Sequence, residues 1–329
     1  MITIRDIMRA RDRISRYVLW TPVILSDYLS DVTGATVHLK LECLQRLNSF
    51  KVRGAMNKFL TLTRDEREKG VLAVSSGNHG AAVSYCAKML GVKADVFIPA
   101  GTPVAKLEKI RRYGADLHIE GETYDESHAL AKAYLSRTDK IYVDPASDEV
   151  AVAGHGTIGL EILEDVPRVD SILVPVGGGG LITGASLAAK AMHPVKVIGV
   201  QTEACPAMLK ALEDKTFYED YPSKPSICDA VVGGVGEIGY TYAEKCIDRV
   251  VTASEDAVRE AMVELLRKDK VVAEPSGALG VAYLLEHPDE FTGMNVAVVV
   301  SGGNVDFELL RDTLAGFTEK PRGLGQPPI

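Results

Sequence analysis

Runs of β-forming apolar residues alternate with segments of helical spacing along most of the chain. The β-rich runs cover residues 71–74, 94–98, 116–119, 171–176, 196–200, 249–252 and 296–300. The helical patterns between them fall near residues 81–90, 104–113, 124–135 and 254–267. This alternation is typical of parallel sheets whose faces are covered by helices. The pattern therefore predicts an α/β fold with parallel-rich sheets flanked by helices.

Two further helices are expected earlier in the chain. Residues 4–17 predict an amphipathic helix, with apolar side chains roughly along one face at Ile4, Ile7, Met8 and Ile14. Another helix is expected after Thr63, because Glu66 follows three positions later, as in a capping box.

The chain of 329 residues is long enough for two domains with separate hydrophobic cores. We interpret the polar, turn-rich segment 143–147 as a crossing between them. The expected large domain comprises residues 1–66 and 148–329, and a small mobile domain, residues 67–147, is inserted in it. The Pro-rich segment 320–328 is expected to be a loose tail, and no regulatory domain is expected beyond it.

Composition and charge argue against several kinds of partner. A net charge of −8 at pH 7 without a basic tract disfavours nucleic acid or an anionic membrane as the main partner. No apolar run is long enough to span a membrane or to form a secretory signal, so a cytoplasmic location is expected. The five cysteines are scattered without a C-x-x-C pair, which predicts reduced thiols rather than a zinc site, a disulfide framework or a catalytic cysteine.

Lys51 is the first candidate for chemistry. It follows a strand-like run at 37–42 and precedes a helical pattern that begins at Ala55. Near a helix N-terminus the helix dipole disfavours the charged ammonium, and partial burial lowers the pKa of the amine further. A neutral amine is a nucleophile that forms a Schiff base with an aldehyde. The alternative is an ordinary solvated lysine, which a lone lysine usually is.

A run of four glycines is the second candidate. It follows the apolar run at 171–176 and precedes a helix start near Ile182. Glycines let successive backbone N–H groups converge on one anion, and the helix N-terminus adds positive potential. No Gly-Lys-Ser/Thr follows the glycines, which excludes a Walker loop. The sequence also lacks the third glycine of the dinucleotide-binding fingerprint. The pattern predicts a phosphate-binding cup and not merely a tight turn. The cup would be formed by Gly177, Gly178, Gly179, Gly180 and Leu181.

Two more polar turns follow predicted strands. After residues 71–74, the hydroxyls of Ser75 and Ser76 can hold a carboxylate, and Asn78 can donate to a phenolic oxygen. A plain helix cap by either serine is the alternative. Ser301 follows the last strand and can meet a ring nitrogen, although it also fits a simple strand-to-turn junction. A reactive lysine, a phosphate cup and a carboxylate loop together fit pyridoxal phosphate with an amino-acid substrate.

These features lie in segments with a recognisable family pattern. The segments are Ser49-Phe50-Lys51-x-Arg53-Gly54-Ala55, Ser75-Ser76-Gly77-Asn78-His79-Gly80, Ala153-Gly154-x-Gly156-Thr157, the four glycines and Ser301-Gly302-Gly303-Asn304. In content and order they resemble the threonine dehydratase and serine racemase family, and they span nearly the whole chain. The resemblance implies fold type II of the pyridoxal phosphate enzymes, the tryptophan synthase β-like fold.

The resemblance also implies roles for individual residues and a homodimeric state. Lys51 would be the Schiff-base lysine. The other cofactor contacts would come from Phe50 beside the ring, Asn78 at the phenolic oxygen, Gly177 to Gly180 and Leu181 around the phosphate, and Ser301 at the pyridine nitrogen. The substrate carboxylate would be held by Ser75, Ser76, Asn78 and His79.

Some positions depart from the family pattern. Asn48 replaces a usual glycine, but asparagine tolerates left-handed backbone better than most residues. His155 stands where glutamine is common. Gln201 and Ala207 stand where metal-dependent members carry carboxylates, which leaves a bound Mg²⁺ or Ca²⁺ undecided. His128 falls where the mammalian racemase has a substrate-binding arginine, so the substrate is the least determined part of the resemblance.

The expected activity is a β-elimination. Lys51 would hold the cofactor, give way to the substrate amine and then take the α-proton as a general base. Loss of the β-hydroxyl gives an enamine that hydrolyses to a 2-oxo acid and ammonia. L-Threonine or L-serine is the expected substrate, which would make the protein an ammonia-lyase.

Several alternatives remain open at this point. Ser76 on the cofactor face opposite Lys51 would suit a racemase, because a hydroxyl there can return the proton with inversion. His128 and the altered crossing at Ala146 leave room for 3-hydroxyaspartate or a bulkier hydroxy amino acid. β-Replacement chemistry uses the same fold. A binding module without turnover is the remaining alternative, and the presence of Lys51 argues against it.

Overall fold

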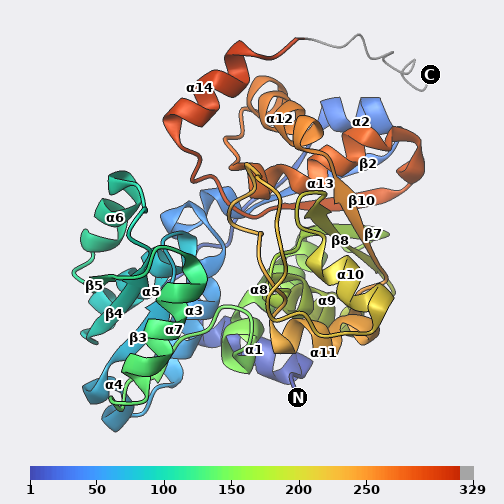
Figure 1. Ribbon diagram of the computed structural model, residues 1–329. Helices are drawn as coiled ribbons and strands as arrows, with labels where there is room; N and C mark the ends of the chain where they lie inside the picture. The colour runs from blue at the N-terminus through green and yellow to red at the C-terminus, as the bar shows by residue number, and fades with distance from the viewer. Residues whose placement is uncertain (319–329) are drawn as a thin grey trace.

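The computed structural model describes residues 1–318, which form two β-sheets (Figure 1). The larger sheet has the strand order β1-β2-β10-β7-β8-β9. Neighbouring strands in it are parallel, except for the antiparallel pair β1 and β2. The strands are β1 (Val23–Leu25), β2 (Thr36–Leu41), β7 (Ser171–Pro175), β8 (Lys196–Thr202), β9 (Arg249–Ala253) and β10 (Asn295–Val300).

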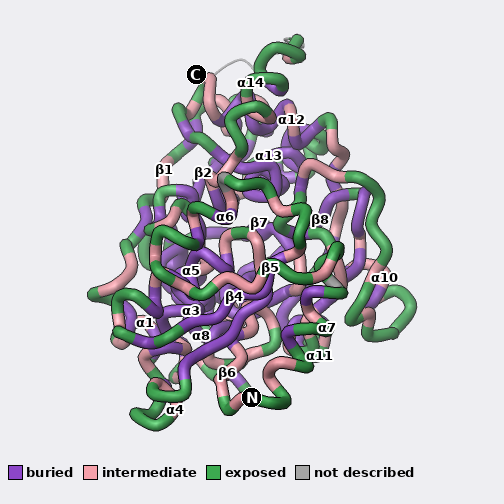
Figure 2. Tube along the Cα trace, turned by 60° about the vertical axis from the view of Figure 1, so that its left-hand side comes forward, coloured by how far each residue is buried: buried purple, intermediate pink, exposed green. Residues whose placement is uncertain are grey.

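The smaller sheet has the order β5-β4-β3-β6 and is parallel throughout. It is formed by β3 (Val71–Val74), β4 (Ala94–Ile98), β5 (Asp116–Ile119) and β6 (Ile141–Tyr142). Every residue of β3 and β4 is buried, and Figure 2 shows this stretch in purple. The predicted runs 71–74, 94–98 and 116–119 coincide with β3, β4 and β5. β6 was not expected, because two residues are too few to show a periodic pattern.

Helices surround both sheets within the described residues. They are α1 (Ile4–Ile14), α2 (Asp27–Thr33), α3 (Lys51–Thr61), α4 (Arg64–Lys69), α5 (Asn78–Leu90), α6 (Val104–Arg111), α7 (Tyr124–Leu135), α8 (Glu149–Asp165), α9 (Gly180–Met192), α10 (Ala207–Asp214), α11 (Glu237–Cys246), α12 (Glu255–Glu264), α13 (Pro275–Glu286) and α14 (Phe307–Ala315). None of these helices is both long and apolar enough to cross a membrane.

The predicted helix boundaries are correct for some helices and shifted for others. The capping box expected at Thr63 is present at the start of α4, where the Glu66 carboxylate accepts from the Thr63 N–H at 2.7 Å. α7 matches its predicted range. α12 ends earlier than predicted, because a π-helical turn, Leu265–Asp269, follows it.

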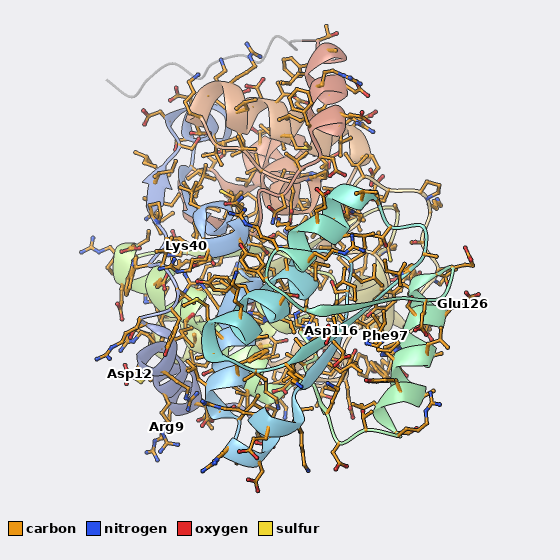
Figure 3. All side chains as sticks on the ribbon, turned by 90° about the vertical axis from the view of Figure 1, so that its left-hand side faces the viewer. Arg9, Asp12, Lys40, Phe97, Asp116 and Glu126 are labelled. Carbon is orange, nitrogen blue, oxygen red and sulfur yellow. The ribbon has the colours of Figure 1, made fainter. Side chains whose placement is uncertain are left out.

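The first helix is shorter than its pattern suggested. α1 ends at Ile14, and its buried face consists of Ile7, Ala10 and Ile14. The prediction that Met8 shares this face is wrong, since Met8 is 45% exposed. At 100° per residue Met8 points well away from the line through the three buried residues. Figure 3 shows that Arg9 and Asp12 of α1 also point away from the body of the molecule.

The two faces of the large sheet pack against different helices. Ile172 and Val174 of β7 belong to a core with α8 and α9, whereas Leu173 between them packs into a core with α13. Alternate residues of a strand point to opposite faces, so helices cover both sides of the sheet. α5 and α7 both contact the small sheet, which lies with α4 and α6 on the left of Figure 1. The parallel-rich α/β fold is thereby confirmed, while the boundaries of the two expected domains stay a prediction.

Glycines allow helices α8 and α9 to pack at close range. A Cβ on Gly159 of α8 would lie 2.2 Å from the carbonyl oxygen of Ala185 in α9. A Cβ on Gly184 of α9 would lie 2.3 Å from the carbonyl oxygen of Val152 in α8. Real Cβ atoms do not approach backbone this closely, so glycine allows the two helix backbones to touch. This contact sets the position of α9, whose first residue belongs to the four-glycine turn.

Candidate active site

A cavity lies just beyond the carboxyl ends of β7 and β10, the edge at which ligands bind in open parallel sheets. α3 and the glycine turn both open onto it. Its lining contains all the predicted cofactor-contacting residues, namely Phe50, Lys51, Asn78, Gly177, Gly178, Gly179, Gly180, Leu181 and Ser301. The remaining lining residues are Pro145, Ala146, Pro175, Ala230, Val231, Glu274 and Ser276. The structure thus brings the lysine, the glycine turn and the serine together, and their roles toward a cofactor stay predictions.

Lys51 occupies the first position of α3, as its neighbours indicated. The turn before it has left-handed backbone at Asn48 (φ 54°), as expected for asparagine, and also at Leu47 (φ 63°), which was not expected. Backbone hydrogen bonds tie this turn to the Ser301 turn: the Phe50 N–H donates to the Ser301 carbonyl at 3.2 Å, and the Gly303 N–H donates to the Asn48 carbonyl at 2.9 Å. The lysine and Ser301 are therefore held in fixed register.

The Lys51 amine is less basic than an ordinary lysine. Burial lowers the pKa of Lys51 to about 8, although the charges of Asp144 and Glu274 act in the opposite direction. The Nζ atom lies 4.9 Å from the centre of the Phe50 ring. The sequence predicted a lowered pKa from the helix dipole and burial, and the structure identifies burial as its main cause. It also adds two nearby carboxylates that the sequence did not point to.

This low pKa predicts an unusual reactivity profile for the cofactor-free protein. Acetylation of Lys51, followed by peptide mass spectrometry, should reach half its maximal rate near pH 8, because the free amine is the reacting species. A lysine in a short peptide should do so near its ordinary pKa of about 10.4. The free-amine fraction rises with pH, so the Lys51 curve should lie on the acidic side of the peptide curve. Coincident curves would contradict the burial assigned to Lys51.

The glycine turn leads from β7 into α9. Gly179 has φ +90°, and no side chain caps the helix. A Cβ on Gly180 would lie 2.6 Å from the Pro145 carbonyl oxygen, so the crossing segment is pressed against the turn. The first hydrogen bond of this helix is donated by Thr183 to the Gly179 carbonyl, and no described residue accepts from the N–H groups of Gly178 to Leu181. Free N–H groups at a helix N-terminus suit an oxyanion such as phosphate.

Asn78 belongs to a partly buried polar network rather than standing alone. Its side-chain amide nitrogen lies 2.8 and 3.1 Å from the two carboxylate oxygens of Glu274, and its oxygen accepts from Asn304 at 2.7 Å. Burial raises the pKa of Glu274. The sequence predicted that Asn78 donates to a phenolic oxygen, but here its donor group faces Glu274. Glu274 lies directly before Pro275 at the start of a helix. An acidic residue in an apolar stretch is only a weak sequence signal of a functional site, which is why the sequence did not indicate Glu274.

Of the predicted carboxylate loop, Asn78 lines the cavity, whereas Ser75, Ser76 and His79 are not among its lining residues. The Ser75 hydroxyl accepts from the Gly77 N–H at 3.1 Å. The N-cap of α5 is Gly77, without a side-chain cap, so neither serine caps the helix in the way the alternative interpretation proposed. His79 is buried, its Nε2 lies 2.8 Å from the Val143 carbonyl oxygen, and burial lowers its pKa to about 4. The assignment of Ser75, Ser76 and His79 to substrate binding stays a prediction.

His155 supports the Lys51 turn from below. Its ring packs edge-on against Phe50, with centroids 4.8 Å apart. A Cβ on Gly54 would lie 2.3 Å from its Cε1, so only glycine fits one helical turn after Lys51. Neither ring nitrogen has an aligned hydrogen-bond partner among the described residues, and burial lowers the pKa of His155 well below its usual value. His155 therefore stays neutral beside Lys51.

Beneath the site lies a buried ionic cluster, formed by Lys40, Glu42, Arg53 and Glu161. The Arg53 guanidinium holds Glu42 through two hydrogen bonds of 2.8 Å, and Glu161 through bonds of 2.6 and 2.7 Å. Lys40 Nζ completes the cluster at 2.6 Å from Glu161. Figure 3 labels Lys40 in this region. The cluster joins β2, α3 and α8, which fixes the helix that carries Lys51.

The described residues contain neither a reactive cysteine site nor a metal-binding cluster. All five cysteines are buried and free, and burial raises the pKa of Cys43 to about 12 and that of Cys246 to about 11. Among residues 1–318, no group of three or more His, Cys, Asp or Glu side chains could hold a metal ion. Gln201, one of the two departures from the metal-dependent pattern, is buried and bonded at both ends, to the Val176 carbonyl and the Leu209 N–H. The predicted tail, 320–328, lies outside the described residues.

Comparison with known proteins gives a consistent result. Residues 14–302 match the family model described as pyridoxal-phosphate dependent enzyme. The L-threonine ammonia-lyase of Thermotoga maritima is 42% identical over 312 residues, which cover 94% of this chain and 77% of that protein. The structure of maize serine racemase matches with a TM-score of 0.88 and 32% identity, covering 95% of this chain and 97% of that one.

A third relative has a similar fold. The structure of threonine deaminase isoform 2 from Solanum lycopersicum matches with a TM-score of 0.89 and 30% identity, covering 95% of this chain and 86% of that one. The family model and these similarities confirm the resemblance that the sequence motifs indicated. The chain belongs to the pyridoxal-phosphate dependent enzyme family.

Proposed function

We propose that the protein is an ammonia-lyase that eliminates water from a β-hydroxy amino acid, with L-threonine and L-serine as its main substrates. The products are a 2-oxo acid and ammonia. The observation that carries this proposal is the pairing of a half-buried Lys51, whose pKa is lowered, with a glycine turn that offers free N–H groups in one cavity. The 42% sequence identity with the L-threonine ammonia-lyase of Thermotoga maritima supports this choice of reaction.

The lining residues fit pyridoxal phosphate. The N–H groups of Gly178 to Leu181 would hold the phosphate, and Lys51 would bind the aldehyde carbon. Phe50 would lie beside the ring, and the Ser301 hydroxyl would face its nitrogen. When bound, this cofactor supplies an electron-withdrawing ring that stabilises negative charge at the substrate Cα.

The protein's own residues would handle the proton and the solvent. Lys51 Nζ, neutral above its pKa of about 8, would accept the proton from the substrate Cα. His79 and His155 stay neutral near it, so they would neither compete as cations nor repel the ammonium that forms. The Ser75–Gly77 turn would hold the α-carboxylate at the start of α5.

A direct assay tests the function. The purified protein with added pyridoxal phosphate is incubated with L-threonine, L-serine and L-threo-3-hydroxyaspartate, and 2-oxo acid, ammonia and D-amino acid are measured together. Equal amounts of 2-oxo acid and ammonia from threonine or serine are expected. No 2-oxo acid from any of the three would refute the proposal. Repeating the assay with a chelator shows whether activity requires a divalent cation. We also propose that the protein is a homodimer, which size-exclusion chromatography tests, and that it is located in the cytoplasm.

Racemisation is the second candidate activity, because Ser76 lies in the turn before α5 and the maize relative is a serine racemase. If the Ser76 hydroxyl returns the proton on the face opposite Lys51, Ser76→Ala should remove D-serine formation and leave elimination largely unchanged. Ser75→Ala serves as the neighbouring control and should weaken carboxylate binding, which raises KM for both reactions. Unchanged D-serine formation in Ser76→Ala would exclude this role.

A further inference from the structure

Glu274 is a buried carboxylate in the cavity wall that the proposed reaction does not use. It lies directly before α13, lines the cavity and is only 7% exposed. Its backbone N–H donates to the Gly302 carbonyl at 3.0 Å, and a Cβ on Gly302 would lie 2.2 Å from its Oε1. The start of α13 and the turn after β10 therefore hold this carboxylate in place.

The Glu274 carboxylate accepts hydrogen bonds from two asparagines on other segments. Asn78 Nδ2, at the start of α5, donates to Oε1 at 2.8 Å and to Oε2 at 3.1 Å. The backbone N–H of Asn304 donates to Oε2 at 3.1 Å. The Asn304 side chain also donates, through Nδ2, to Asn78 Oδ1 at 2.7 Å. Three segments that are distant in sequence thus meet in a closed ring of hydrogen bonds.

Groups that can only accept fix the orientation of the Asn78 amide. Besides Asn78, the Asn304 Nδ2 donates to the Leu47 carbonyl at 2.8 Å. A backbone carbonyl has no hydrogen to donate, so the nitrogen of the Asn304 amide is the atom that faces Leu47 and Asn78. Asn78 must then present its oxygen to Asn304 and its nitrogen to Glu274. The reversed amide would place nitrogen against nitrogen at one end and oxygen against oxygen at the other.

This orientation leaves one donor of Asn78 for the cavity. Both Glu274 oxygens belong to one carboxylate and lie on the same side of Asn78 Nδ2, so one of the two amide hydrogens serves them. No other described residue accepts from this nitrogen, and Asn78 lines the cavity. The Asn78 oxygen is engaged by Asn304. Asn78 therefore offers the cavity a donor rather than an acceptor, as an ionised phenolic oxygen requires.

We propose that Glu274 is a positioning residue, which holds the Asn78 amide so that its nitrogen donates to the phenolic oxygen of pyridoxal phosphate. This role rests on the cofactor binding of the proposed function. A donor to a charged oxygen contributes more to binding than a bond between neutral groups. Without the carboxylate, the Asn78 nitrogen loses its acceptor, and the amide is free to rotate away from the cofactor. Glu274 would thus act through Asn78, without touching the cofactor itself.

The test measures the dissociation constant of pyridoxal phosphate by titrating the cofactor-free protein and following absorbance. Glu274→Gln keeps the shape of the side chain. Its amide nitrogen would face one of the two N–H donors, from Asn78 or Asn304, in either orientation. The dissociation constant should rise about 10-fold or more. The matched control is Glu286→Gln at the other end of α13, where the carboxylate accepts from the Ser254 hydroxyl at 2.6 Å and does not line the cavity. This control should leave the constant unchanged.

A double-mutant cycle distinguishes positioning from general damage to the site. Asn78→Ala should weaken cofactor binding by itself. In that background, Glu274→Gln should change the dissociation constant by less than about two-fold, because the donor that Glu274 holds is already gone. If Glu274→Gln does not fold, as judged by thermal melting, Asn304→Ala removes the other partner of Asn78 and should weaken binding in the same way.

Two results would overturn the role of Glu274 while leaving the elimination intact. One is an unchanged dissociation constant in Glu274→Gln. The other is an equal loss of affinity with and without Asn78, which a merely structural role would give. A wild-type protein that binds pyridoxal phosphate but forms no 2-oxo acid would refute the elimination instead, and the binding measurements would still decide the role of Glu274.

Discussion

Lys51→Ala should produce 2-oxo acid at least about 1,000-fold more slowly than the wild type, because in the proposed function this one residue supplies both the nucleophile for the cofactor and the base for the α-proton. The fold should survive. The replaced amine lies in a cavity where burial already disfavours its charge, so its removal relieves an electrostatic cost. Turnover, thermal melting and the mass of the borohydride-treated holoenzyme are the measurements. The treated wild type should carry one covalently fixed cofactor, and the variant should carry none.

The matched control lies on the same helix. Lys58 pairs with Asp148 at 2.7 Å and does not line the cavity, so Lys58→Ala should keep both the covalent adduct and the activity. Substantial turnover by Lys51→Ala, or an adduct that persists in it, would contradict the role of Lys51. Loss of the adduct in Lys58→Ala would indicate instead that any change in α3 disturbs the site.

Arg53→Met should have the largest effect on stability, lowering the free energy of unfolding by about 3–5 kcal/mol. Arg53, Glu42 and Glu161 are buried, and the guanidinium holds both carboxylates. After the substitution Lys40 is the only cation of the cluster and it pairs with Glu161, so Glu42 keeps the Thr21 hydroxyl as a hydrogen-bond donor but has no opposite charge paired with it. Urea unfolding followed by circular dichroism measures the loss. Arg64→Met, which breaks a surface pair with Glu68 whose side chains are 90% and 65% exposed, should change stability little.

The pH dependence of this loss identifies its cause. In the wild type, burial raises the pKa of Glu42, but the charge and hydrogen bonds of Arg53 bring it below its usual value. Ionised Glu42 therefore contributes stability that is present at neutral pH and lost in acid. Without Arg53, burial prevails, the pKa of Glu42 rises, and its neutral form is favoured. The difference between the variant and the wild type should shrink at mildly acidic pH. A difference independent of pH would point to lost packing instead.

Local patterns predicted the elements and several details of the site. Apolar runs marked β3, β4 and β5, because a strand buried on both faces must be apolar along its whole length. The position of Lys51 at a helix start and the glycine turn before α9 were also predictable, since both depend on residues adjacent in sequence. The left-handed backbone at Asn48 followed from the same local chemistry.

Long-range contacts decided the rest. Glu274 is 223 residues from Lys51 in sequence (274 − 51), and no periodicity could indicate that its carboxylate meets Asn78 and acts on the lysine. Asp144 sat in a segment that the sequence marked only as a crossing, and the ionic cluster around Arg53 joins three separate elements. A sequence records which groups are available, but burial and electrostatic coupling depend on distances that exist only after the chain has folded. Local sequence patterns therefore predicted the fold class and indicated Lys51 as the lysine we propose to be reactive, whereas the charges around that lysine follow from contacts between distant parts of the chain.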